Sequence, residues 1–136
     1  MTPSAFVQRN PYKGVNPRSW VRLRFEAADG TLHERELIAD TGCPFVVILG
    51  LADLALLERM PAPGTPSTFG PLTGAQFALS MPELGLTAAV LGYGNDTILQ
   101  DVRQESPDFA GLPLLRMLEY GGDSTAFWVR KASGTP

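Results

Sequence analysis

The sequence is poor in the residues that most often form disulfides and metal sites. Its 136 residues include one cysteine, Cys43, and one histidine, His33. A single cysteine excludes an intrachain disulfide and a cysteine metal cluster, and a single histidine excludes a His-rich metal site within one chain. This composition favours a reducing compartment, and we expect a cytoplasmic location.

Strong charge and long apolar runs are also missing. Charged residues make up 18% of the chain, and the net charge is −3, so the basic surface that holds nucleic-acid phosphates is not expected. No apolar run is long enough to span a membrane, and the N-terminus lacks the apolar stretch of a secretory signal. We therefore expect a soluble protein with no nucleic-acid or membrane partner.

The residues that are present suit one folded domain. Hydrophobic residues make up 44% of the chain, enough for a sizeable core in a single domain of this length. Residues 1–18 are rich in proline and charge and predict an extended N-terminal arm. Residues 19–131 would form the domain, and residues 132–136 a frayed tail.

Two strands are expected to come early in the domain. From Trp20, the apolar residues Val21, Leu23 and Phe25 alternate with charged ones, which is typical of a half-buried strand. Asp29-Gly30 is a strong hairpin signal. The return strand would run over 31–39 and become apolar as it approaches Asp40.

The rest of the chain alternates strand patterns with two short helices. The expected elements are a buried strand at 45–49, a helix at 51–60, a hairpin at 67–81 with its tip at 70–74, a strand at 86–93, a helix from Pro113 to Tyr120 and a strand at 124–130. Together these predict a mainly β protein, a small closed barrel with two short helices.

The segment Asp40-Thr41-Gly42 is the strongest chemical signal. It follows the apolar residues Leu37-Ile38-Ala39, where a carboxylate is costly to bury unless it is hydrogen-bonded or shares a proton. Two such carboxylates held together cannot both ionise, so one acts as a base while the other keeps a proton. A threonine hydroxyl can brace the turn, and glycine lets it approach a neighbour closely.

With this motif in place, the sequence resembles the retropepsin-like aspartic proteases. Phe109-Ala110-Gly111 is similar to that family's second motif, two apolar residues and a glycine before the C-terminal helix. Residues 67–81 occupy the position of the family's flap, the hairpin that closes over substrate. The resemblance covers roughly residues 20 to 130 and implies a closed barrel of the retropepsin type. The flap residues that it implies are Gly70, Pro71, Leu72, Thr73 and Gly74.

The resemblance also implies roles and partners. Asp40 would be the catalytic carboxylate, Thr41 would bridge to the same turn of a second subunit, and Gly42 would keep the two turns close. Ala110 and Gly111 would support the loop. Because the chain has one such motif, a homodimer would complete the site by two-fold symmetry. The substrate would be a peptide or protein, hydrolysed without metal or organic cofactor.

Two other functions remain open. A non-catalytic peptide-binding or dimerisation module could use the same barrel, because function belongs to the site and not to the fold. Pro44, where the family commonly has serine or threonine, and Ala110, where it commonly has a large aliphatic residue, favour this alternative. An unrelated barrel with a chance Asp-Thr-Gly is the third possibility.

The remaining candidate residues have simpler interpretations. Cys43 with His33 as its base is disfavoured, because strand geometry puts them on the order of 20 Å apart. We expect the other aspartates to be solvated residues of helices and loops: Asp53, Asp96, Asp101, Asp108 and Asp123.

Overall fold

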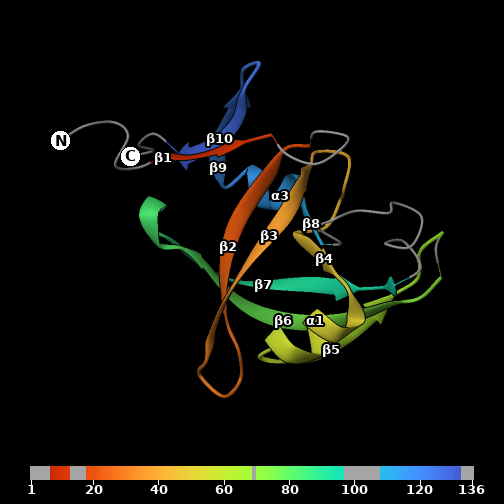
Figure 1. Ribbon diagram of the computed structural model, residues 1–136. Coiled ribbons are helices and arrows are strands. Elements are labelled where there is room, and N and C mark those ends of the chain that lie inside the picture. Colours follow the sequence, from red (N-terminus) through yellow and green to blue (C-terminus); the bar gives the residue numbers. More distant parts are fainter. Residues whose placement is uncertain (1–6, 13–17, 69, 97–107, 133–136) are drawn as a thin grey trace.

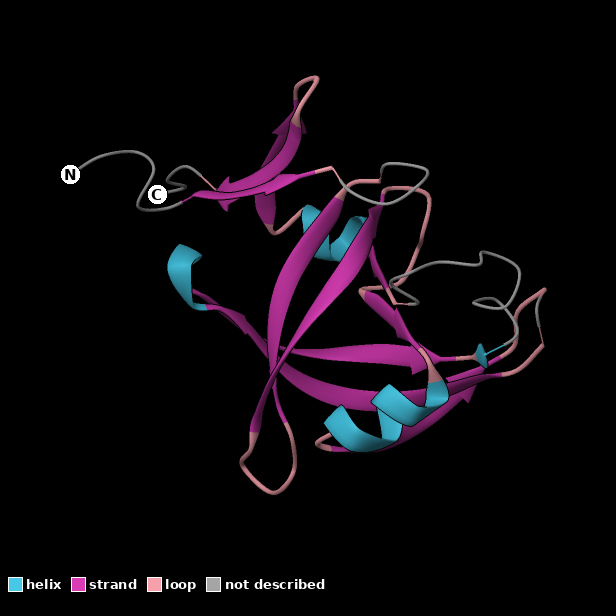
Figure 2. Ribbon diagram, in the orientation of Figure 1, coloured by secondary structure: helices cyan, strands magenta, loops and turns pink. Residues whose placement is uncertain are grey.

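A computed structural model describes residues 7–12, 18–68, 70–96 and 108–132, and strands dominate it (Figures 1 and 2). The strands are β1 (Val7–Pro11), β2 (Trp20–Glu26), β3 (Leu32–Asp40), β4 (Val47–Leu49), β5 (Met60–Thr65), β6 (Leu72–Met81), β7 (Leu86–Gly94), β8 (Phe109–Gly111), β9 (Leu118–Gly122) and β10 (Ala126–Lys131). The helices are α1 (Leu51–Leu57), the 3₁₀ turn η2 (Pro82–Leu84) and α3 (Leu112–Leu115).

Six of these strands close into a barrel. They are hydrogen-bonded in the order β2-β3-β8-β4-β7-β6, and β6 then pairs with β2 to complete the ring. The long β6 makes this closure possible. Residues 73–81 pair with β7 on one edge, and on the other edge residues 78–80 pair with β2 and residues 72–76 with β5, which lies outside the ring. The predicted mainly β fold, a small closed barrel with short helices, is confirmed.

The β2–β3 hairpin shows how the sequence pattern becomes a core. Val21, Leu23 and Phe25 are fully buried on the inner face of β2, as their alternation predicts. The aromatic rings of Phe25 and Phe77 of β6 pack edge to face, with their centroids 5.7 Å apart. This contact joins β2 and β6, the two strands that close the barrel. The turn uses Gly30 at φ +85, a conformation that glycine adopts without strain.

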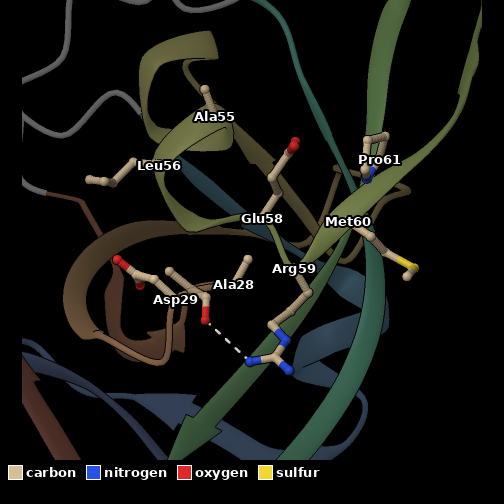
Figure 3. Close-up of a pocket in the computed structure, with 9 residues that line it drawn as sticks. Ala28, Asp29, Ala55, Leu56, Glu58, Arg59, Met60 and Pro61 are labelled. Atoms are coloured by element: carbon tan, nitrogen blue, oxygen red, sulfur yellow. Dashed lines mark hydrogen bonds between the residues drawn. The ribbon is translucent and has the colours of Figure 1, made fainter.

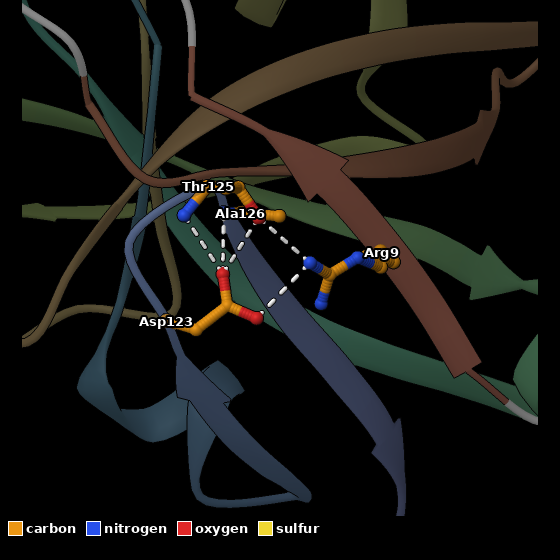
Figure 4. Close-up of polar contacts among 4 residues, drawn as sticks. All are labelled: Arg9, Asp123, Thr125 and Ala126. Carbon is orange, nitrogen blue, oxygen red and sulfur yellow. Dashed lines mark hydrogen bonds and ion pairs between the residues drawn. The ribbon is translucent and has the colours of Figure 1, made fainter.

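A smaller sheet lies against one end of the barrel (Figure 1). Its order is β1-β10-β9, so a strand within the predicted N-terminal arm pairs with the last strand of the domain. Asp123 closes the β9–β10 turn by accepting hydrogen bonds from the backbone of Thr125 and Ala126, and it pairs with Arg9 of β1 at 3.0 Å (Figure 4). The pKa of Asp123 lies below its usual range, mainly because Thr125 donates hydrogen bonds to its carboxylate.

Strand β1 also satisfies backbone groups of β2, through side-chain hydrogen bonds instead of a backbone ladder. Asn10 donates to the carbonyl of Trp20 at 2.9 Å, and Gln8 donates to the carbonyl of Arg22 and accepts from its N–H. Asn10 further donates to Gln8 at 2.8 Å, and it is only 1% exposed. Buried amides in such a network stabilise the fold only while every partner is present.

Two elements differ from the sequence-based prediction near the first helix. Helix α1 ends at Leu57 instead of residue 60, and residues 60–65 form strand β5, which the sequence pattern did not predict. Pro61 and Pro63 are tolerated because β5 is the last strand of its sheet, and an edge strand does not need every N–H. The hairpin therefore begins earlier than predicted, with its tip at 66–71.

The second helix is also shorter than predicted. Helix α3 ends at Leu115, and the region expected to continue it forms β9. Gly121, just beyond the predicted helix, lies opposite Trp128 of β10, and a Cβ there would come within 2.7 Å of the indole ring. Among the described residues, no helix combines the length and apolar character needed to cross a membrane.

Replacing Asn10 tests the side-chain pairing of β1 with β2. Asn10→Ala leaves the Trp20 carbonyl and the Gln8 amide short of a partner in a buried place, so we expect a loss of about 1–3 kcal/mol of unfolding free energy. Thr87→Ala, at an exposed position of β7, is the control and should change stability by less than about 0.5 kcal/mol. Urea unfolding measures both, and equal stability of the two variants would contradict the assigned role.

Candidate active site

Pairing of strands brings the two sequence motifs together. Strand β8 runs parallel to β3, with Ala39 opposite Ala110 and Asp40 opposite Gly111. On its other side β8 is antiparallel to β4, so Val47 faces Ala110. The short β8 is buried along its whole length. Asp40 and Gly111, 71 positions apart in the sequence, are thus adjacent.

The Asp40 turn is stabilised by its own backbone. Asp40 Oδ1 accepts a hydrogen bond from the N–H of Gly42 at 2.9 Å, and the Asp40 carbonyl accepts one from Cys43 at 3.0 Å. The carboxyl group is partly exposed, and Thr41 and Gly42 are exposed. The geometry fixes one carboxylate oxygen within the turn and leaves Oδ2 as the second oxygen for chemistry or for a partner.

Gly111 allows the loop after Asp40 to cross directly behind it. A Cβ at Gly111 would overlap the carbonyl oxygen of Phe45 and lie 2.7 Å from that of Cys43. The loop is fastened there by two backbone hydrogen bonds, from Gly111 to Val46 at 2.9 Å and from Leu112 to Cys43 at 3.0 Å. A glycine is therefore required by space and not by its φ angle.

Cys43 is a packed residue of this loop. It is 7% exposed, and its thiol lies 3.6 Å from the Phe45 carbonyl that it can donate to. Burial, and to a lesser degree the Asp40 charge, raises the pKa of the thiol. His33 lies seven positions before Asp40 on β3 and contacts Thr31 at 2.8 Å, so the structure does not bring it to Cys43.

The predicted flap residues divide between a turn and a strand. Gly70 and Pro71 lie in the β5–β6 turn, where Gly70 and Ser67 exchange backbone hydrogen bonds of 3.1 Å. Leu72, Thr73 and Gly74 instead belong to β6, and Leu72 is buried. The tip of the hairpin comes earlier than the sequence predicted, because residues 60–65 form a strand that was not expected.

The end of β7 connects this hairpin to the rest of the site. Asn95, buried just after β7, donates its side-chain amide to the carbonyl of Pro71 at 3.3 Å. Its backbone N–H donates to the carbonyl of Leu49 at the end of β4. The base of the hairpin tip is therefore linked through β4 to β8, the strand that places Gly111.

Asp108 is the residue whose position the sequence did not reveal. It was expected to be solvated, yet it is 2% exposed, immediately before β8. Its Oδ1 accepts from the N–H of Gly50 at 2.9 Å, and burial together with a hydrogen bond to Asp53 raises its pKa to about 7. Asp96 and Asp123 are exposed as expected, Asp53 is half-buried, and Asp101 is outside the described residues.

A separate shallow pocket of about 260 Å³ lies at the far end of β3 from Asp40. Residues 27–29 of the β2–β3 turn and residues 55, 56 and 58–61 around the end of α1 surround it (Figure 3). Arg59 is held there by Glu26 at 3.0 Å and by the Ala27 carbonyl. No predicted site residue contributes to its lining.

Within the residues that the structure describes, no three His, Cys, Asp or Glu side chains are grouped to hold a metal ion. No protein-family model, curated protein or solved structure matches this chain.

A methyl group at Gly111 tests whether close packing behind Asp40 is required. Gly111→Ala must displace the backbone of residues 43–45, so we expect a loss of about 2–3 kcal/mol of unfolding free energy. Gly42→Ala, in the same loop, is the matched control, because its Cβ would meet only the movable Asp40 carboxylate at 3.2 Å. Chemical denaturation compares them, and a Gly111→Ala protein as stable as Gly42→Ala would contradict this packing.

The environment of Cys43 predicts a thiol that reacts slowly with disulfide reagents. A buried thiol with a raised pKa forms little thiolate, so we expect labelling by a disulfide reagent at pH 8 to be at least about tenfold slower than in urea. Ellman's reagent with and without urea measures this. Equal rates under both conditions would show that the loop opens readily.

Proposed function

We propose that the protein is an aspartic endopeptidase that acts as a homodimer, with one Asp40 from each subunit. The observation that carries the proposal is the pairing of Asp40 with Gly111 across β3 and β8, which joins the two motifs of the resemblance at one place. A partly exposed carboxylate on a turn that is rigidly hydrogen-bonded is the kind of group such catalysis uses.

The chemistry requires two carboxyl groups that share a proton. The ionised Asp40 would take a proton from a water molecule as its oxygen bonds to the scissile carbonyl carbon. The protonated Asp40 of the second subunit would give its proton to the carbonyl oxygen. Asp40 would then give its new proton to the amide nitrogen, while a hydroxyl group of the tetrahedral gem-diol would return a proton to the Asp40 of the second subunit. The C–N bond breaks as the C=O bond re-forms, and both carboxyl groups return to their starting state.

The exposed parts of the loop support assembly with a second copy. Thr41 and Gly42 are exposed in one chain, so the same turn of a partner could approach them along a two-fold axis. The β5–β6 hairpin would cover an extended peptide, and its closure would exclude water. We propose a cytoplasmic protein without cofactor, because the single buried Cys43 needs no oxidising compartment.

A second candidate is a non-catalytic module that holds a peptide or dimerises through the same loop. One observation favours it. Asp40 Oδ1 accepts a hydrogen bond from its own turn, as in many structural turn aspartates. A binding module of this kind would keep its dimer and its peptide without Asp40 chemistry.

Asp40→Asn separates the two candidates. An amide cannot act as the base, so we expect peptide cleavage at mildly acid pH to fall by at least about 10³-fold while the fold and dimer persist. Asp29→Asn is the matched control, since Asp29 is also a turn aspartate that accepts from the N–H two residues on, at 3.0 Å. It should cleave as the native protein does.

The readouts are cleavage of a peptide library, inhibition by a statine-type transition-state mimic, and sedimentation to measure the dimer. Full activity of Asp40→Asn would exclude the peptidase. Absence of cleavage by the native chain, with retained dimer and peptide binding, would establish the binding module in its place.

A further inference from the structure

The carboxyl group of Asp108 is buried at a junction of three elements and has no part in the proposed catalysis. It stands just before β8, and its backbone carbonyl accepts from the N–H of Ile38 on β3 at 2.9 Å. Its side chain reaches the N–H of Gly50 before α1 at 2.9 Å. One residue therefore ties together β8, β3 and the start of α1.

Asp53 on α1 acts on this carboxyl group, because a hydrogen bond between the two carboxyl groups is the second cause, after burial, that raises the pKa of Asp108. Two carboxylates have only acceptors, so this bond exists only if one of the pair carries a proton. Removing that proton leaves two negative charges in contact in a place where Asp108 is 2% exposed. A hydrogen bond between the two carboxyl groups therefore depends on protonation.

In the part of the chain that the structure describes, Arg35 of β3 is a cation that faces the pair. Its Nε and Nη2 atoms reach Asp53 Oδ1 at 3.4 Å, too long for strong ion-pair hydrogen bonds, and its charge offsets part of the rise in the pKa of Asp108. Asp96 lies at the same end of α1, where it accepts from the N–H of Leu51 at 2.9 Å and adds a further negative charge. Among the described residues, one arginine thus stands against three carboxyl groups.

We propose that Asp53 and Asp108 form a proton-dependent clasp that fastens α1 to the start of β8 in acid and opens as the solution becomes neutral to alkaline. With one shared proton the pair joins α1 to β8. Without it, repulsion favours separation of the two elements. Because β8 carries Gly111 at its other end, opening the clasp would loosen the strand that supports the Asp40 turn.

The direction of the pH effect follows from the raised pKa. Burial, then the hydrogen bond to Asp53, brings the pKa of Asp108 to about 7, above its unfolded value of 3.8. The folded chain therefore holds the proton more tightly than the unfolded chain. The stability that this proton provides is complete below the unfolded pKa and is lost as the pH rises toward and through about 7.

The inference for catalysis rests on the proposed peptidase, whereas the clasp itself does not. If the chain is a peptidase, its activity should fall above neutral pH together with local stability. If no peptidase activity exists, the titration and stability measurements below still decide the clasp, so the two proposals can fail separately.

Carboxyl ¹³C NMR of the full chain from pH 3 to 9 is the first experiment. We expect one aspartate carboxyl group to titrate near pH 7 and to disappear in Asp108→Asn, while Asp96→Asn, at the same helix end, retains it. If Asp108→Asn does not fold, Asp53→Asn replaces it and should lower that titration by at least about one pH unit. Titration of every aspartate below about pH 5 would overturn the proposal.

Thermal unfolding across pH 5–8 is the second measurement. The amide of Asp108→Asn can accept from Gly50 and donate to Asp53, so it imitates the protonated clasp at every pH. Relative to this variant, the native protein should lose on the order of 5 °C in Tm between pH 5 and pH 8. A Tm difference that does not vary with pH would also overturn the proposal.

Discussion

The position of β8 between β3 and β4 is the constraint on which the rest of the structure depends. Three residues, Phe109-Ala110-Gly111, provide the parallel partner of β3 and the antiparallel partner of β4. Without them the ring of six strands is open, and the turn after Asp40 has nothing behind it. A side chain larger than hydrogen at Gly111 displaces the backbone of the Asp40 loop, because residues 43–45 cross at that point.

The position of β8 between β3 and β4 also allows the barrel to be small. Strand β4 is only three residues long, yet it pairs with β8 on one side and with β7 on the other. Backbone groups at the start of a helix or on an unpaired strand edge lack a regular partner, and polar side chains supply one. Asp108 and Asp96 accept hydrogen bonds from N–H groups at the start of α1, and Asn10 donates one to a carbonyl on the edge of β2.

Patterns within one segment were read correctly from the sequence. The alternation in β2 and the turn at Gly30 are local features that occur where they were predicted. The apolar run predicted as a strand at 45–49 contains β4, but the strand begins at Val47. The errors involve residues whose local preference is overridden by a partner distant in the sequence. Pro61 is compatible with a strand only because β5 lies at a sheet edge, and Gly121 is in a strand because Trp128 lies across it.

The candidate site shows the same division. The sequence by itself determined a mainly β chain with one Asp-Thr-Gly turn after an apolar strand, and it indicated Gly111 as that turn's companion. Only the tertiary structure decided that Gly111 lies against the Asp40 loop, that Cys43 is buried there, and that Asp108 is enclosed with Asp53. The physical reason is that periodicity reports which face of an element is apolar, whereas burial of one polar group depends on which elements meet around it.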